Sequence, residues 1–122
     1  MSGLYSILNR FPGSHVLVIG DIILDHFLWG QASRISPEAP VPVVNVREEE
    51  YLLGGAANVL RNIISLGGTG ELCGIIGEDS MGKKVSSLLE ALGDSGLGLI
   101  KGERPTTLKT RVLAHGQQIV RI

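Results

Sequence analysis

Two aspartates lie just after an apolar run near the start of this 122-residue sequence. The run His-Val-Leu-Val-Ile at 15–19 predicts a strand buried on both faces, Asp21 follows it closely, and Asp25 comes four residues later. Proteins that alternate strands and helices bind ligands at the carboxyl ends of their strands. An ionised carboxylate only accepts hydrogen bonds, so one aspartate there can hold two neighbouring hydroxyl groups of a sugar. A turn at Asp21 and a surface position for Asp25 would explain the same residues without a ligand.

A second group of polar and small residues precedes an apolar, helical pattern. Gly54 and Gly55 stand next to each other, and Asn58 follows shortly after them. Glycines let the backbone come close to a ligand, and the first N–H groups of a helix are free to donate. Asn58 has both a donor and an acceptor, which suits a hydroxyl group. A tightly packed helix start is the alternative, and the dinucleotide-binding fingerprint is excluded because no Gly-x-Gly-x-x-Gly follows a strand.

A third group carries positive charge. Lys109 and Arg111 are two residues apart in an expected strand, so they share one face, and Thr110 and Val112 take the other. Two cations on one face suit an anionic substrate, and arginine can bind a phosphate through two parallel hydrogen bonds. Arg34 adds a further cation in an expected loop that also has two serines. An exposed face that is charged only for solubility would explain the pair equally well.

Composition and charge exclude several classes of protein. A net charge of −1 provides no field that would recruit nucleic acid or an anionic membrane. The apolar runs are too short to span a bilayer, and residues 1–11 lack the pattern of a secretory signal. The single cysteine, Cys73, excludes an intrachain disulfide and is expected to be a buried thiol. We therefore expect a cytoplasmic protein that binds neither nucleic acid nor a membrane.

The three histidines do not predict a metal site. His15, His26 and His115 lack the spacing of metal ligands, so we expect them at ordinary surface or turn positions. The sequence also has neither a Walker-type phosphate loop nor the turn that presents a catalytic serine in hydrolases.

The elements that must position these residues alternate along the chain. We expect helices at 4–10, 56–66 and 81–92, strands at 15–19, 26–29, 41–46, 71–76, 106–114 and 117–122, and a loop at 93–102 with room for a short strand. Buried strands that alternate with amphipathic helices predict a parallel α/β core. The proline-rich segment at 33–42 and the final hairpin do not fit that core and predict a separate, partly exposed sheet. Only about two core strands are present, which indicates an incomplete domain.

Three of these features resemble one family. Gly54-Gly55-Ala56-Ala57-Asn58, with Gly67 downstream, is similar to the N-terminal signature of the PfkB, or ribokinase-like, carbohydrate kinases. Gly77-Glu78-Asp79-Ser80-Met81-Gly82 resembles the glycine–acid turn of that family, and Asp25 matches its sugar-binding aspartate. The segments at 33–43 and 107–112, the latter followed by Gln117-Gln118, resemble the D-glycero-β-D-manno-heptose 7-phosphate kinases within the family.

The resemblance implies a fold and a set of site residues. The fold would be a partial ribokinase-like three-layer α/β/α core with a β-sheet lid built from about 26–47 and 107–122, and residues 1–122 would form the N-terminal part of one kinase domain. Lids of this kind pair between subunits, which implies a homodimer. The expected sugar-binding residues are Asp25, Gly54, Gly55 and Asn58, the expected phosphate-binding residues are Lys109 and Arg111, and Asp21 and Arg34 are further substrate-binding candidates.

The resemblance also implies an activity. Kinases of this type transfer the γ-phosphate of ATP, with Mg²⁺, to the anomeric hydroxyl of a sugar phosphate in making ADP-heptose for lipopolysaccharide, and they are often fused to an adenylyltransferase domain. Their catalytic aspartate, anion hole and adenine pocket correspond to sequence beyond Ile122, so we expect no catalytic residue, no bound ATP or Mg²⁺ and no activity in this chain alone. The alternatives are another PfkB-family sugar kinase and a non-catalytic, dimerising sugar-binding module.

Overall fold

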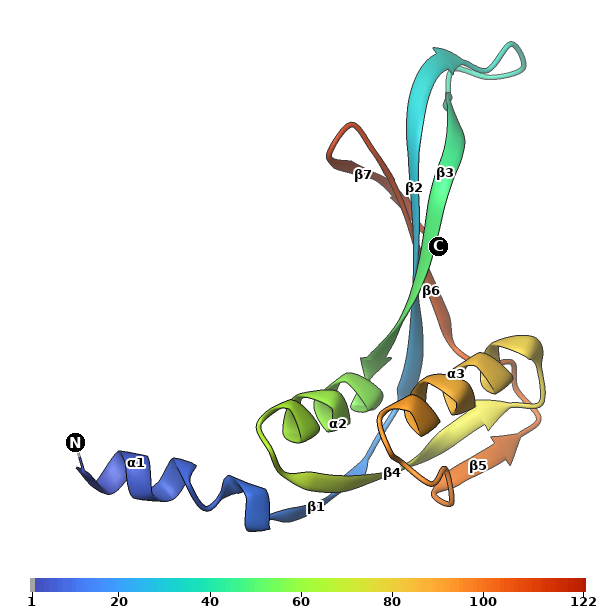
Figure 1. Ribbon diagram of the computed structural model, residues 1–122. Helices are drawn as coiled ribbons and strands as arrows, with labels where there is room; N and C mark the ends of the chain where they lie inside the picture. The colour runs from blue at the N-terminus through green and yellow to red at the C-terminus, as the bar shows by residue number, and fades with distance from the viewer. Residues whose placement is uncertain (1) are drawn as a thin grey trace. The chain divides into compact units, whose positions relative to one another are not determined.

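The computed structural model describes residues 2–122 and separates into two compact units (Figure 1). The first unit comprises the residues up to 24 together with 53–107, and the second comprises 25–52 and 108–122. The chain passes from one unit into the other within two long strands and again after Thr107. No helix among these residues has the length and the apolar character needed to cross a membrane.

The first unit is a parallel sheet with helices. Its elements are α1 (Ser2–Leu8), a 3₁₀ turn (Phe11–Gly13), β1 (His15–Ile19), α2 (Ala56–Ser65), β4 (Thr69–Gly77), α3 (Ser80–Ala91) and β5 (Leu99–Gly102). The strands lie in the order β1-β4-β5, with Val18 opposite Leu72 and Ile75 opposite Ile100. Each crossover adds a strand on the same side, and Figure 1 shows α2 and α3 on one face of the sheet. The predicted α/β core is confirmed.

The core of the first unit lies between this sheet and its two helices. Its fully buried side chains come from both layers and include Leu60, Leu72, Val85 and Leu89. A Cβ atom on Gly70 would lie 2.7 Å from Leu60 Cδ1, so the absence of a side chain there lets α2 pack directly on β4. The apolar side chains whose helical spacing predicted these two helices are therefore the ones that face the sheet.

The other face of the parallel sheet is exposed. In β1 only Val18 is buried, whereas Leu17 and Ile19 are 60% and 72% exposed. Ile75 and Ile100 carry the exposed apolar surface on into β4 and β5, and Cys73, two residues before Ile75 in β4, is half-buried. The predictions of a strand buried on both faces and of a buried thiol are therefore wrong, because α2 and α3 lie on one face of the sheet only.

The second unit is built from a sheet in the order β3-β2-β6-β7. Its strands are β2 (Ile22–Ile35), β3 (Pro42–Gly55), β6 (Leu108–Ala114) and β7 (Gln117–Arg121). The strands predicted at 26–29 and 41–46 are much too short, because Gly30 does not end β2. A Cβ on Gly30 would lie 2.7 Å from Val44 Cγ1, so this glycine allows a close approach of β2 and β3 within a long ribbon.

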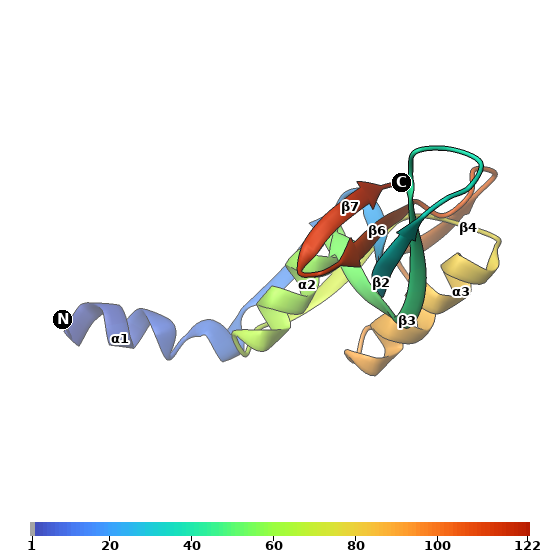
Figure 2. The same cartoon turned by 90° about the horizontal axis from the view of Figure 1, so that it is seen from above.

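The hairpin at the end of the chain is confirmed. β6 and β7 are antiparallel, with Ala114 opposite Gln117, and Figure 2 shows them side by side. His115 and Gly116 occupy the turn with φ values of 53° and 74°, as expected of a two-residue turn whose twist matches the strands. The backbone groups of Thr110 and Ile122 exchange two hydrogen bonds of 2.9 Å, which hold the last residue against β6.

Candidate functional site

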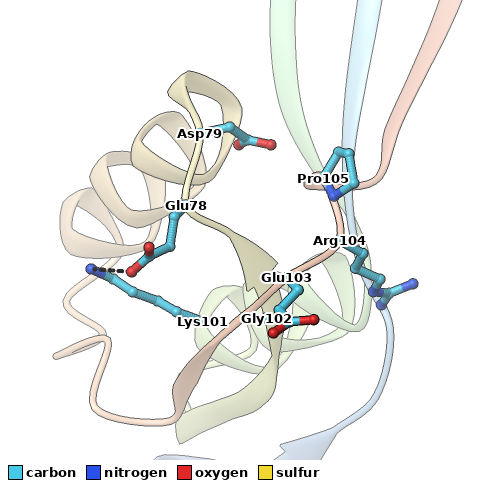
Figure 3. A pocket seen from close by; sticks show the side chains of 7 residues that line it. All are labelled: Glu78, Asp79, Lys101, Gly102, Glu103, Arg104 and Pro105. Atoms are coloured by element: carbon cyan, nitrogen blue, oxygen red, sulfur yellow. Dashed lines mark ion pairs between the residues drawn. The ribbon is translucent and has the colours of Figure 1, made fainter.

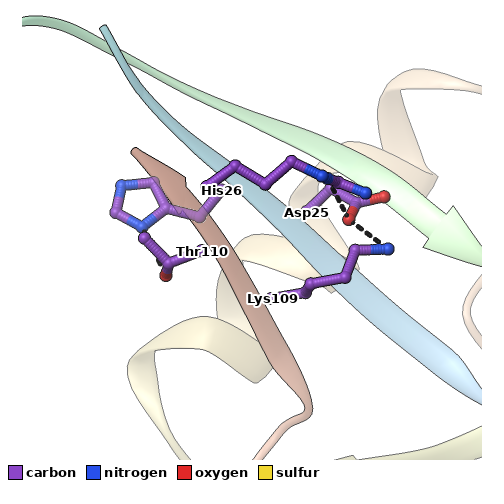
Figure 4. Close-up of polar contacts among 5 residues, drawn as sticks. Asp25, His26, Lys109 and Thr110 are labelled. Carbon is purple, nitrogen blue, oxygen red and sulfur yellow. Dashed lines mark hydrogen bonds and ion pairs between the residues drawn. The ribbon is translucent and has the colours of Figure 1, made fainter. Parts of the chain in front are cut away.

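Two of the predicted cations bind the predicted aspartate. Lys109 Nζ lies 2.6 Å and Arg111 Nη1 2.9 Å from the same oxygen, Asp25 Oδ1 (Figure 4). We call these three residues the Asp25 cluster; all belong to the second unit. Thr110 and Val112 are buried on the opposite face of β6, so the predicted shared face of Lys109 and Arg111 is confirmed.

The sheet order explains how residues so distant in sequence meet. β2 and β6 are hydrogen-bonded neighbours, and Leu24 N donates to the carbonyl of Thr107 at 2.8 Å directly before the cluster begins. The side chains of Asp25, Lys109 and Arg111 are 16%, 26% and 23% exposed, so water screens their attraction only in part. Two cations share one carboxylate, and the cluster keeps a net positive charge that can attract an anion.

Two aromatic side chains adjoin the cluster and were missed in the sequence. Phe27 and Trp29 alternate with Asp25 along β2 and so project from the same face. Their rings stack with centroids 5.9 Å apart and planes 14° apart, and the guanidinium carbon of Arg111 lies 5.0 Å from the centroid of Phe27. The strand alternation Asp-x-Phe-x-Trp was a usable signal, but β2 was expected to begin only at His26.

His26 occupies the opposite face of β2 and is buried, so its predicted surface position is wrong. Its Nε2 lies 3.1 Å from Glu49 Oε2, and its Nδ1 lies 3.1 Å from the Thr110 hydroxyl, so both ring nitrogens have hydrogen-bond partners. The ring also stacks on Tyr51 with centroids 4.3 Å apart. Burial, and secondly the charge of Glu49, raises the pKa of the Tyr51 hydroxyl above its usual value. This network stabilises the sheet behind the Asp25 cluster.

The other two histidines match their prediction. His15 and His115 are exposed, and His115 lies in the hairpin turn, where its Nε2 donates to the carbonyl of Ala32 at 2.9 Å.

The glycine pair and Asp21 meet in the first unit. Gly55 has φ of +58°, and a Cβ there would collide with the carbonyl oxygen of Asp21. The next residue, Ala56, donates its N–H to that same oxygen at 2.9 Å, so the carbonyl of Asp21 is bound to the start of α2. Gly54 is buried, whereas the Asp21 side chain is exposed. Gly55 therefore has a structural role at the tightly packed start of α2, which was the alternative reading of this motif.

Asn58 and Arg34 also differ from their predicted surroundings. Asn58 Oδ1 accepts a 2.8 Å hydrogen bond from Arg61, so its amide nitrogen is the group that can donate to a ligand. Arg34 is exposed near the end of β2, where a loop was expected. Asp21, Gly54, Gly55 and Asn58 belong to the first unit, and Asp25, Arg34, Lys109 and Arg111 belong to the second.

The glycine–acid turn at 77–82 is held together by one carboxylate. Asp79 caps α3: its Oδ1 accepts from Gly82 N at 2.7 Å and from the Thr106 hydroxyl at 2.7 Å, and its Oδ2 accepts from Thr106 N at 2.8 Å. The Thr106 hydroxyl in turn accepts from Gly77 N at 2.9 Å. These hydrogen bonds, with that from Thr106 N first, lower the pKa of Asp79. Asp79 was predicted as one of two possible caps, and this is confirmed.

An open hollow of about 620 Å³ lies beside this turn, where β4 and β5 end (Figure 3). Lys101 Nζ lies 3.6 Å from Glu78 Oε1 across it, and Glu103 and Arg104 add one charge of each sign. The Glu78 and Lys101 side chains are about 70% exposed, so their ion pair contributes little. Three carboxylates and two cations line the hollow, and it contains none of the predicted substrate-binding residues.

Comparison with known proteins gives sequence relatives and structural neighbours. The chain is 53% identical over 108 residues to a Helicobacter pylori protein and 50% identical over 121 residues to one from Pelobacter propionicus, both named Bifunctional protein HldE. These matches cover 88% and 96% of the chain but only 23% and 24% of the relatives, so the chain spans about a quarter of their length.

Solved structures show the same fold. Phosphofructokinase-2 from Escherichia coli is one such neighbour, and it was solved in complex with fructose-6-phosphate. It matches with a TM-score of 0.66 at 22% identity, over 88% of this chain and 34% of that chain. The predicted ribokinase-like fold class is thereby confirmed as a partial core. The pfkB family carbohydrate kinase model matches residues 14–122. Nearly the whole chain lies within that match, and the protein therefore belongs to the pfkB family of carbohydrate kinases.

Proposed function

We propose that this chain is the sugar-binding part of an ATP-dependent kinase that phosphorylates a heptose 7-phosphate at its anomeric hydroxyl, a step towards ADP-heptose for lipopolysaccharide. The observation that carries this proposal is the identity of about half of all matched residues, over 88–96% of the chain, to proteins named HldE. A family neighbour solved with fructose-6-phosphate supports a sugar phosphate as the class of substrate. A cytoplasmic location is part of the same proposal.

The Asp25 cluster supports the recognition of a phosphorylated sugar. Asp25 Oδ1 binds both cations, and its second oxygen can accept from sugar hydroxyls. Lys109 and Arg111 together carry one more charge than Asp25 neutralises, and this excess favours a phosphate over a neutral group. Gly54, Gly55, Asn58, Asp21 and Arg34 stay predictions from the sequence as further substrate contacts.

ATP and Mg²⁺ are assigned to the remainder of such a kinase. Among residues 2–122, no group of three or more His, Cys, Asp or Glu side chains could hold a metal ion. The acidic side chains around the hollow beside Asp79 are accompanied by Lys101 and Arg104, and Asp79 itself is engaged by Thr106 and Gly82. These residues do not fit a nucleotide–metal site, so no step of phosphoryl transfer is derived from them.

A homodimer through the four-stranded sheet is part of the proposal. β3 and β7 are the edge strands of that sheet, and both expose apolar side chains, including Val46, Ile119 and Val120. Open edges of this kind seek a partner strand. Sedimentation of the chain as a compact monomer at high concentration would contradict this assembly.

A chimera tests the proposed activity. This chain replaces the matching segment of the Pelobacter propionicus relative, and Michaelis constants are measured for D-glycero-β-D-manno-heptose 7-phosphate and for ATP. Loss of a charge-assisted bond to phosphate, as in Arg111→Ala, should raise the constant for the sugar about ten- to a hundredfold and leave that for ATP nearly unchanged. The matched control is Arg121→Ala, because Arg121 lies opposite Arg111 in the hairpin but is exposed.

The same chimera distinguishes the alternatives. A kinase for a neutral sugar would phosphorylate heptose and heptose 7-phosphate with similar efficiency. Arg111→Ala would then change the Michaelis constants for these two sugars alike. A chimera that folds, as judged by its thermal melting, but phosphorylates no sugar would contradict the proposed function.

A further inference from the structure

Phe27 and Trp29 form a stack of two aromatic rings on the strand that also carries Asp25. All three side chains project from one face of β2 because they are two residues apart. The rings stack with centroids 5.9 Å apart and planes 14° apart, so each covers part of the other, and Trp29, which is 40% exposed, supplies the open part of the stack. We call Phe27 and Trp29 the aromatic wall.

The aromatic wall is coupled to the charged groups through Arg111. The guanidinium group lies over the Phe27 ring at 5.0 Å and donates to Asp25 Oδ1 at 2.9 Å. Phe27 is therefore partly covered by a cation, whereas Trp29 is 40% exposed. A large exposed aromatic beside a charged cluster is a feature that neither the packing of the sheet nor its solubility requires.

This combination of groups fits the two kinds of surface of a sugar ring. A pyranose presents hydroxyl groups around its edge and a patch of C–H groups on its face. The hydroxyl groups need acceptors and donors, which Asp25, Lys109 and Arg111 provide, and the C–H patch is best buried against a flat apolar ring.

We propose that the aromatic wall binds the C–H face of the substrate sugar, with Trp29 as the residue that determines ring specificity. The proposal rests on the proposed function, since it assumes that Asp25 contacts the same sugar. A second copy of the chain is the competing occupant of Trp29. A second copy packed on Trp29 would bury the Asp25 cluster without replacing the hydrogen bonds that the cluster makes to water, and such burial of charged groups is costly. The hydroxyl groups of a sugar do replace those hydrogen bonds.

Trp29 is the only tryptophan in the chain, so its fluorescence reports on its own surroundings. We titrate the 122-residue chain with heptose 7-phosphate, with fructose 6-phosphate and with ATP. The expected result is a saturable change in emission with the heptose phosphate, a weaker response with the smaller sugar, and none with ATP.

The chimera gives the second measurement. Loss of one aromatic contact corresponds to about a three- to tenfold rise in the Michaelis constant for the sugar in Trp29→Ala. The turnover number and the constant for ATP should stay within twofold, and Trp29→Phe should restore most of the affinity. The control is Ile119→Ala, because Ile119 is also an apolar side chain of the second unit and is also 40% exposed.

The outcomes separate the two proposals. A chimera that phosphorylates heptose 7-phosphate but whose Michaelis constant stays within twofold in Trp29→Ala overturns the aromatic wall and leaves the proposed function standing. A change in sedimentation with no change in that constant would assign Trp29 to an interface between copies. If the fluorescence titration and the Michaelis constant differ, the constant decides. A folded chimera with no sugar kinase activity overturns both proposals.

Discussion

Replacing Asp25 by asparagine should destabilise the chain more than removing either of its cationic partners. Asparagine has nearly the shape of aspartate but no charge, so Lys109 and Arg111 would lose their shared counter-ion. They would also keep their mutual repulsion, because both now reach the same carboxylate oxygen, at 2.6 and 2.9 Å. Loss of one cation is different, since Asp25 would still be paired with the other.

The geometry sets the size of these effects. Hydrogen bonds to charged groups contribute about 1.5–3 kcal/mol where they are buried, and exposed ion pairs about 0–1 kcal/mol. The three side chains are 16–26% exposed, which places the cluster between these limits. We expect Asp25→Asn to lower the free energy of unfolding by about 1–3 kcal/mol, and Lys109→Met and Arg111→Met by about 0.5–1 kcal/mol each.

The assay is urea unfolding of the 122-residue chain at neutral pH, in low and in high salt. High salt should reduce the differences only in part, because partly buried charges are poorly screened. In the background of Lys109→Met and Arg111→Met, the change at Asp25 should cost much less than it does alone, since no cation is left without a partner. Glu50→Gln is the control, because Glu50 is an exposed carboxylate of β3.

A loss of stability in Arg111→Met as large as that in Asp25→Asn would contradict the role given to the shared carboxylate. That result would mean that Arg111 stabilises the sheet mainly through its contact with Phe27, and that the shared carboxylate contributes little.

Three further expectations follow from other contacts. Gly55→Ala should destabilise the chain by about 1–3 kcal/mol, because Gly55 has φ of +58° and a Cβ there would meet the Asp21 carbonyl. The control in the same urea assay is Gly13→Ala, which should be nearly neutral because the space around Gly13 is open. The pKa of Asp79 is lowered in the folded chain, so Asp79 contributes stability that is fully present above the ordinary pKa of 3.8 and is lost as the pH falls through the lower pKa of the folded state. In urea unfolding curves measured over a series of pH values, Asp79→Asn should therefore reduce the loss of stability at acid pH. The chain alone should consume ATP with sugar at less than about a tenth of the rate of the chimera, and comparable turnover would contradict the assignment of the catalytic groups to the remainder of the kinase.

Local patterns predicted the first unit well. The strand at 15–19 was predicted with its exact ends, and the helix at 56–66 ends one residue earlier in the structure, because apolar spacing and a glycine pair mark such a helix on both sides. The cap at Asp79 was recognisable because an aspartate before an amphipathic run accepts from the free N–H groups of the helix. The bonds from Asp79 to Thr106 were not predictable, since their partners are 27 residues apart.

The long ribbon of the second unit was not predictable from the same signals. Gly30 and the glutamates at 48–50 lie beyond the strands expected at 26–29 and 41–46, but in the structure they lie within β2 and β3. Glycine is tolerated there because the facing strand approaches closely, and the glutamates because their side chains are exposed. His26 was misplaced for a related reason: a polar residue in a short predicted strand reads as surface, and its burial depends on Glu49 and Thr110, which lie on other strands.

The Asp25 cluster marks where sequence reasoning about charge ends. Alternation along β6 correctly placed Lys109 and Arg111 on one face, but alternation does not say what that face meets. In the structure it meets a carboxylate, so the two cations cannot both be available to a phosphate in full. Arg111 is held by two contacts, to Asp25 and to Phe27, whereas Lys109 has one, on a flexible stem. A phosphate that enters this face would therefore release Lys109 from Asp25 at the smaller cost, while Arg111 keeps its bond to Asp25 and offers its other N–H donors to the phosphate.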